Sequence, residues 1–116
     1  MQCANHFVLT CPDATEFREF IDQELGDDRG DQGITVVQRC AKGIKFNQVT
    51  IGAPDFAWLH GLITNYPNCW IKNEWIEEGG MAGVWVGSVN GVRSLTWKDL
   101  SLEAQHDIFQ PMQPQH

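Results

Sequence analysis

The sequence is poor in positive charge, because eight Lys and Arg residues stand against fifteen Asp and Glu residues, for a formal net charge of −7. Such an excess of acids repels nucleic acids and anionic membranes at long range, so direct nucleic-acid binding is not expected. The chain also lacks an apolar run long enough to span a membrane, and its first residues, MQCANHFVLTCPD, lack the features of a signal peptide. We therefore expect a cytoplasmic protein.

Motifs that would indicate a metal, a phosphate or a reactive nucleophile are also missing. The cysteines have no CxxC spacing, and the histidines have no zinc-type spacing. No glycine-rich loop precedes a helix in the manner of a P-loop. We expect the four cysteines to be reduced and mostly to act as small buried apolar groups: Cys3, Cys11, Cys40 and Cys69. These absences favour a protein that is not an enzyme and uses no metal or cofactor.

What the sequence does contain is enough apolar material for a core. Hydrophobic residues make up 42% of its 116 positions, and five of them are tryptophans. This length and composition fit one folded domain. We expect a single domain over residues 1–109 and a disordered tail, QPMQPQH, over residues 110–116.

Five segments have the alternation or β-branched composition of strands, and two have helical periodicity. In chain order they are the strand NHFVLTC, a helix from Asp13, the strands ITVVQRCA and IKFNQVTIG, the helix PDFAWLHGLITNY, and the strands CWIKNEWI and MAGVWVGS. Glu16 lies three residues after Asp13, as in a capping box. The apolar phase changes between Phe46 and Val49, which predicts a bulge near Asn47.

This order predicts an α+β fold. Its first six elements match a ferredoxin-like βαββαβ arrangement, which is an antiparallel sheet with two helices on one face. We expect one extra C-terminal strand, MAGVWVGS, and a short helix, SLEAQHDIF, after the segment NGVRSLTW.

A resemblance supports this fold. The segment from Ala53 to Gly87 contains a helix that ends in Tyr66-Pro67, followed by Glu-Glu-Gly and a strand of small residues. It resembles the ferredoxin-like domain of an uncharacterised family of phage- and plasmid-encoded proteins, named after a phage of an aphid symbiont. The opening strand, CANHFVLTC, resembles that of the family only loosely, and the long central region of larger members is missing. The resemblance implies a ferredoxin-like sheet and a mobile-element origin, but no chemistry.

The stretch NEWIEEGGMAGVWVG places Glu77 and Glu78 beside two glycines. Two carboxylates can serve acid–base catalysis only when both reach one substrate, and adjacent strand residues point to opposite faces. We therefore interpret the stretch as a β-hairpin with solvated acids at its turn. Its tryptophans, Trp75 and Trp85, are expected to build a core or a contact surface.

Acids are concentrated between residues 13 and 31, where eight acids and two bases give a net charge of −6. Glu16, Glu19 and Asp22 step by three along the helix face opposite its apolar stripe. A calcium loop in DDRGDQG is disfavoured because Arg29 occupies a position where calcium would need an oxygen ligand. The acidic face is either an ordinary solvated surface or a surface that binds a basic groove and competes there with nucleic acid.

Together these features predict a small acidic inhibitor from a phage or mobile element, of the anti-CRISPR or anti-restriction kind. Its partner would be a host protein or ribonucleoprotein complex with a basic surface. The predicted partner-binding residues are Glu16, Glu19, Asp22, Glu24, Asp27, Asp28, Asp31, Glu77, Glu78, Trp75 and Trp85.

Three alternatives stay open. One is a nucleic-acid-binding module that uses the uncovered sheet face, although few basic residues flank the strands: Arg39, Lys42, Lys45 and Lys72. The second is a homo-oligomeric accessory protein, such as a homodimer, and the third is a small enzyme.

Overall fold

The computed structural model describes residues 1–26 and 33–97 of the chain. The strands are β1 (Gln2–Thr10), β2 (Ile34–Cys40), β3 (Gly43–Ile51), β4 (Trp70–Glu77), β5 (Ala82–Ser88) and β6 (Gly91–Trp97). The helices are α1 (Ala14–Glu24) and α2 (Phe56–Asn65). The prediction of an α+β fold is confirmed.

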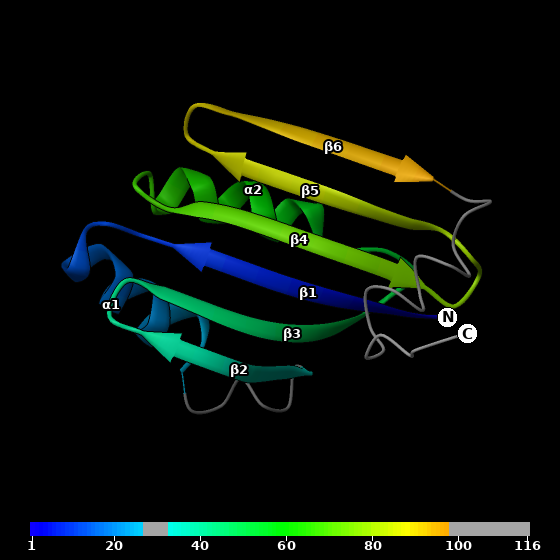
Figure 1. Cartoon of the computed structure of the whole chain (residues 1–116), viewed down its shortest axis with the longest axis horizontal. Coiled ribbons are helices and arrows are strands. Elements are labelled where there is room, and N and C mark those ends of the chain that lie inside the picture. Colours follow the sequence, from blue (N-terminus) through cyan, green and yellow to red (C-terminus); the bar gives the residue numbers. More distant parts are fainter. Residues whose placement is uncertain (27–32, 98–116) are drawn as a thin grey trace, which may run out of the picture.

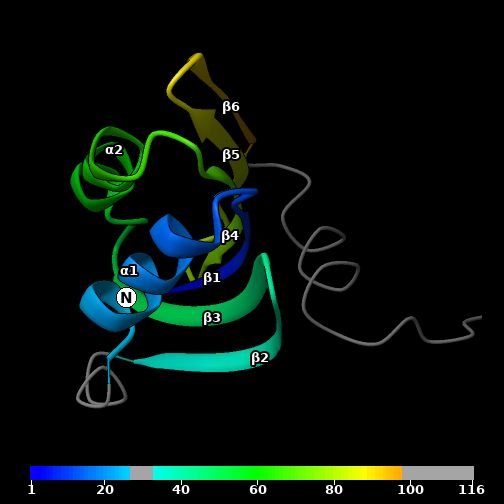
Figure 2. The same ribbon diagram turned by 90° about the vertical axis from the view of Figure 1, so that its left-hand side faces the viewer.

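The strands form one sheet in the order β2-β3-β1-β4-β5-β6, and every neighbouring pair is antiparallel (Figure 1). β1 therefore lies inside the sheet, between β3 and β4. Both helices pack on the same face of the sheet (Figure 2). We call the other face, which no helix of the described residues covers, the open face. Neither described helix has the length and apolar character of a membrane span.

The sheet has one strand more than the sequence predicts, because residues 91–97 pair with β5 as β6. The strand was missed because its segment, GVRSLTW, lacks a clear alternation of apolar and polar residues. β6 is an edge strand among the described residues, and its side chains from 91 to 96 are exposed. An edge strand of this kind needs no buried face and so leaves little pattern in the sequence. The short helix expected at 101–109 and the tail at 110–116 lie outside the described residues.

The predicted bulge near Asn47 is wrong. β3 pairs with β1 in one unbroken register, and the irregularity lies instead in β2, between Val36 and Gln38. The apparent change of phase has another cause. Gln48 and Thr50 follow Phe46 on the helix-covered face as half-buried polar residues, so the apolar residues of this end of β3 are on the exposed side.

Each helix begins at an aspartate whose side chain accepts backbone hydrogen bonds. Asp13 Oδ1 accepts from the N–H groups of Thr15 and Glu16 at 3.0 and 3.1 Å. Asp55 Oδ1 accepts from the N–H of Trp58 at 3.0 Å. These bonds satisfy donors that a helix cannot satisfy internally. The cap at Asp13 is confirmed. Among the described residues, however, the Glu16 side chain does not make the reciprocal bond of a capping box.

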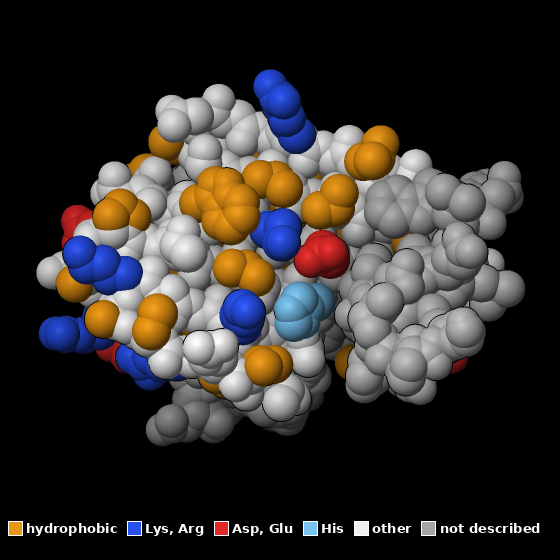
Figure 3. Space-filling view, viewed as in Figure 1, with side chains coloured by type: hydrophobic (Ala, Val, Ile, Leu, Met, Phe, Trp, Pro, Cys, Tyr) orange, Lys and Arg blue, Asp and Glu red, His pale blue; other side chains and the backbone are white. Residues whose placement is uncertain are grey.

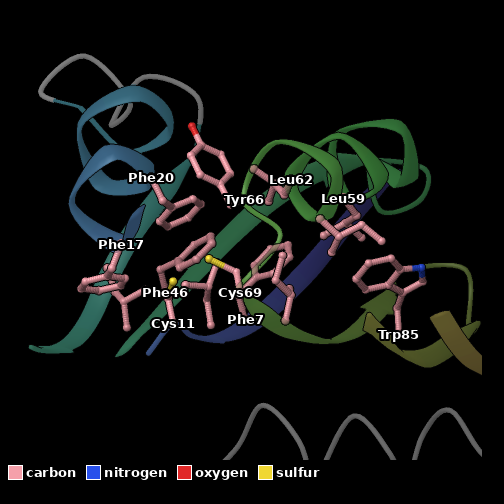
Figure 4. Packing of buried hydrophobic residues seen from close by; sticks show 14 residues of the cluster. Phe7, Cys11, Phe17, Phe20, Phe46, Leu59, Leu62, Tyr66, Cys69 and Trp85 are labelled. Atoms are coloured by element: carbon pink, nitrogen blue, oxygen red, sulfur yellow. The ribbon is translucent and has the colours of Figure 1, made fainter. Parts of the chain in front are cut away.

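The core lies between the sheet and the helices (Figure 4). The rings of Phe7 and Phe46 stack across the β1–β3 pair with centroids 4.6 Å apart. Trp58 of α2 meets Phe7 edge-on at 5.9 Å, and Phe20 of α1 meets Tyr66 edge-on at 5.6 Å. Aromatic pairs in these geometries add to the stabilisation that burial provides.

Glycines in β5 make room for two buried tryptophan rings. A Cβ atom placed on Gly83 would lie 2.7 Å from the Leu95 carbonyl oxygen and 2.7 Å from the Trp75 ring. A Cβ on Gly87 would lie 2.4 Å from the Trp85 ring. The absence of side chains at these two positions lets both rings lie against the β5 backbone.

Gly83→Ala is expected to lower the free energy of unfolding by about 1–3 kcal/mol, because the added methyl overlaps the β6 backbone and a buried ring. The matched control is Gly61→Ala within α2, where an added Cβ has no heavy atom within 4 Å. This control should raise stability by about 0.5–1 kcal/mol, because alanine favours the helix. Urea denaturation followed by tryptophan fluorescence measures both. Equal effects of the two substitutions would contradict this account of β5.

Candidate binding surfaces

Two acids predicted to bind a partner instead hold the fold together. Glu16 Oε2 accepts a hydrogen bond from the Asn68 N–H at 2.7 Å, and its Oε1 accepts from Asn68 Nδ2 at 3.1 Å. Glu24 accepts from Trp58 Nε1 at 3.0 Å and from the Tyr66 hydroxyl at 3.0 Å. Both carboxylates therefore join α1 to the α2 side of the domain. Burial and the Glu24 carboxylate raise the pKa of Tyr66 above its ordinary value.

Of the predicted acids, Glu19 and Asp22 remain as exposed residues of α1. They lie on the side of the helix away from Phe17 and Phe20, which are buried. Asp27, Asp28 and Asp31 lie outside the described residues. The described acidic surface on this helix is therefore smaller than the sequence count indicates.

The β4–β5 hairpin is confirmed, and it separates the four predicted site residues that it contains. Trp75 and Trp85 are 4% and 2% exposed, so their side chains belong to the interior and offer no contact area to a partner. Glu77 ends β4 and is half-buried, whereas Glu78 is exposed in the turn and accepts a hydrogen bond from the Gln2 N–H. The two carboxylates do not form a shared site.

A row of positive charges crosses the open face at one level of the sheet. The register pairs Lys45 of β3 with Val8, Val8 with Lys72 of β4, Lys72 with Val86, and Val86 with Arg93 of β6. Cross-strand partners share a face, so the three cations and two valines point the same way. We call these five residues the cation row. Figure 3 shows basic and hydrophobic side chains interspersed over this face.

Groups beside the cation row modify its charge and shape. Glu74 forms an ion pair with Lys72 at 3.3 Å. Both side chains are partly exposed, so solvent screens the attraction between them. Trp70 lies two residues from Lys72 on the same strand face and is 39% exposed. Trp70 and Arg93 line one surface depression together with Val86. The open face therefore combines an exposed aromatic ring with cations.

Three thiol and carboxylate groups meet at one end of the core. The Sγ atoms of Cys11 and Cys69 and a carboxylate oxygen of Glu16 all lie within 4.8 Å of one another. Glu16 Oε2 is 3.7 Å from Cys11 Sγ and 3.9 Å from Cys69 Sγ. Burial raises the pKa of both thiols above the ordinary value. As predicted, the cysteines are free and mostly buried, with Cys40 as the exposed exception.

Sequence reasoning missed both the cation row and this thiol cluster, because each depends on strand register. The residues of the row come from five strands, and Arg93 lies in the strand that was not recognised. Cys11 and Cys69 are far apart in the chain, so no local spacing connects them. The one available signal is that each flanks a strand, Cys11 after β1 and Cys69 before β4.

Comparisons with known proteins add no relative to this picture. No protein-family model, no curated protein and no solved structure matches the chain significantly. The surfaces described above therefore rest on the geometry of this chain alone.

Glu16→Ala is expected to lower the free energy of unfolding by about 1–3 kcal/mol, because it removes the charged acceptor of two hydrogen bonds from Asn68. Glu19→Ala on the same helix is the matched control and should change stability by less than about 0.5 kcal/mol. Urea denaturation of both variants measures the difference. A loss of similar size in Glu19→Ala would show that α1 is stabilised by its overall charge and not by the Glu16 contact.

Proposed function

We propose that this protein is a binding protein whose open sheet face binds single-stranded nucleic acid in the cytoplasm. The observation that carries the proposal is the cation row, in which Lys45, Lys72 and Arg93 stand in register across the sheet. A single strand carries phosphates at regular intervals, and a groove or row of cations on a protein follows such a backbone.

The spacing in the row suits an extended polyanion. Neighbouring cations of the row are separated by one intervening strand, so their backbones lie about 10 Å apart at ordinary strand spacing. Val8 and Val86 lie between the cations and make the surface of the row partly apolar. A chain of phosphates lying across the strands can meet each cation in turn without a deep pocket.

Trp70 supplies the second part of the proposed recognition. Stacking of a base on an aromatic side chain tolerates any sequence, because every base has a π-face. Trp70 is partly exposed and shares a depression with Arg93, so a base on the ring leaves its phosphate within reach of a cation. This arrangement favours binding without strong sequence preference.

The acidic total does not oppose this proposal, because charge is distributed unequally between the two sides. Glu19 and Asp22 are on α1, which packs on the opposite face of the sheet from the cation row. A polyanion is repelled by the helix side and attracted by the open face. We infer that this asymmetry orients the encounter and makes the association sensitive to salt.

We also infer that the part from β1 to β4 is a ferredoxin-like core, with β5 and β6 added beyond β4. The supporting observation is the order β2-β3-β1-β4 together with a helix between β1 and β2 and another between β3 and β4. We also propose membership of the phage- and plasmid-encoded family, and this proposal rests on the resemblance of the segment from Ala53 to Gly87 to that family.

Lys45→Glu with Arg93→Glu is expected to raise the Kd for fluorescent oligo-uridine or oligo-thymidine of about 20 nucleotides at least about tenfold at low salt. The double variant should also reduce the dependence of log Kd on log salt by about 1.4, since each lost phosphate contact on a single strand accounts for about 0.7. Fluorescence anisotropy over a salt series measures both quantities.

The matched control is Arg18→Glu with Arg39→Glu, which makes the same charge change at exposed residues beside α1. It should leave the Kd within about threefold, because these cations are outside the row. Glu74→Gln should instead tighten binding, since it releases Lys72 from its ion pair. An equal loss of affinity in the two double variants would show that the effect comes from net charge and not from the cation row. Absence of binding by the unmodified chain would refute the proposal.

A second candidate function is favoured by the exposed Glu19 and Asp22. We propose that this acidic face binds a host protein or ribonucleoprotein with a basic surface, as an inhibitor of the anti-CRISPR or anti-restriction kind. Fewer described residues support it than support the sheet face, because Glu16 and Glu24 are engaged inside the fold.

Replacement of Glu19, Asp22, Asp27 and Asp28 with lysine is expected to abolish retention of such a partner from nuclease-treated bacterial lysate, because the basic surface of the partner is then repelled by the introduced lysines. The thermal unfolding midpoint should stay unchanged. The Lys45→Glu, Arg93→Glu variant is the control and should retain the partner. Identical sets of retained proteins, identified by mass spectrometry for all three chains, would rule out this second function.

A further inference from the structure

We propose that Cys11, Cys69 and Glu16 form a binding site for a thiophilic transition-metal ion of the Zn²⁺ class. The site is independent of the nucleic-acid proposal, because it lies in the helix-side core and uses no residue of the cation row. Figure 4 shows the sulfur atoms of Cys11 and Cys69 in yellow.

The strand register brings the two thiols together. The β1–β4 pairing ends at Thr10 and Trp70, and Cys11 directly follows the first of these residues while Cys69 directly precedes the second. Their backbones are fixed, since the Cys11 N–H donates to the Lys42 carbonyl at 2.9 Å and the Cys69 N–H donates to the Tyr66 carbonyl at 3.0 Å. Both side chains are buried, at 0% and 1% exposure. The two sulfurs therefore occupy defined positions and not a range of exposed rotamers.

The carboxylate of Glu16 is the third ligand, and it is also held in place. Asn68 donates to both of its oxygens, at 2.7 and 3.1 Å. Hydrogen bonds of this kind orient a carboxylate ligand from outside the coordination sphere. The half-buried position of Glu16 provides the route to solvent that an ion needs to enter.

The distances match a tetrahedral ion. With Zn–S bonds of about 2.3 Å and Zn–O bonds of about 2.0–2.2 Å, the sulfur–oxygen edges of a tetrahedron are about 3.5 Å long and its sulfur–sulfur edge about 3.8 Å. The observed sulfur–oxygen distances are 3.7 and 3.9 Å, and all three atoms lie within 4.8 Å. Small side-chain movements close this difference. Two thiolates and one carboxylate select Zn²⁺ and similar ions over Mg²⁺ and Ca²⁺.

Binding exchanges two protons for one metal ion. In the metal-free protein each thiol keeps its proton: Cys69 Sγ has Glu16 Oε2 as an acceptor at 3.9 Å, and Cys11 Sγ has the Asp13 carbonyl oxygen at 3.4 Å and Glu16 Oε2 at 3.7 Å. The ion takes the place of these protons, so two Cys–S–H bonds break, two metal–sulfur bonds form and two protons pass to solvent. Metal affinity should then rise with pH, by up to about 100-fold per unit below the pKa of the thiols, because two protons are released.

Co²⁺ titration of the reduced full chain tests the site, because Co²⁺ replaces Zn²⁺ and its bonds to thiolates absorb in the near ultraviolet. We expect one equivalent to bind with the thiolate absorption of two cysteines, followed by displacement with Zn²⁺. Cys11→Ser and Cys69→Ser should each halve this absorption and weaken binding at least about 100-fold, and Glu16→Gln should weaken it about 10-fold or more. The matched control, Cys40→Ser, removes the exposed cysteine and should leave the titration unchanged.

A second measurement avoids dependence on variants that fail to fold. Zn²⁺ should raise the unfolding temperature of the unmodified reduced chain, the shift should grow with pH, and a chelator should reverse it. Absence of thiolate absorption in the unmodified chain, or the same absorption in folded Cys11→Ser and Cys69→Ser, would overturn the proposal.

Discussion

The pairing of β1 with a neighbour on each side is the constraint on which the rest of this structure depends. Because β1 is bonded to β3 and β4 along nearly its whole length, alternate residues are forced to opposite faces. Phe7 and Leu9 are thereby placed beneath the helices, and Val8 is placed among the cations of the open face. The same register ends at Thr10 and Trp70, next to Cys11 and Cys69. One strand thus positions the core, the proposed nucleic-acid surface and the proposed metal site.

The sequence predicts this architecture well wherever burial leaves a period in the pattern. The helix cap at Asp13, the hairpins, and the antiparallel sheet with helices on one face all follow from local signals. The misplaced bulge has its physical origin in polar residues of the covered face. Asn5 and Asn73 are fully buried and bonded to each other at 3.0 Å, and the nearby half of β3 is also polar. Alternation of hydrophobicity is weak where amides replace apolar side chains.

The candidate sites were much less predictable than the fold. A count of charges along α1 cannot distinguish a carboxylate that bonds across the core, such as Glu24, from one in solvent, such as Glu19. The aromatic residues show the same limit, since Trp75 and Trp85 are interior and Trp70 is on the surface. Each difference is decided by strand register or by contacts between distant segments. Composition therefore indicated an acidic protein, whereas the described residues place the cation row on the open face and Glu19 and Asp22 on the helix side.

The irregularity in β2 between Val36 and Gln38 has a consequence for assembly. β2 ends the sheet among the described residues, and the outer edge of such a strand offers unpaired backbone groups to other chains. A bulge interrupts the even spacing of those groups and increases the local twist, so a flat strand from another molecule cannot pair along the whole edge. The defect therefore acts against fibril growth at this edge, which also carries the exposed Val36 and Val37.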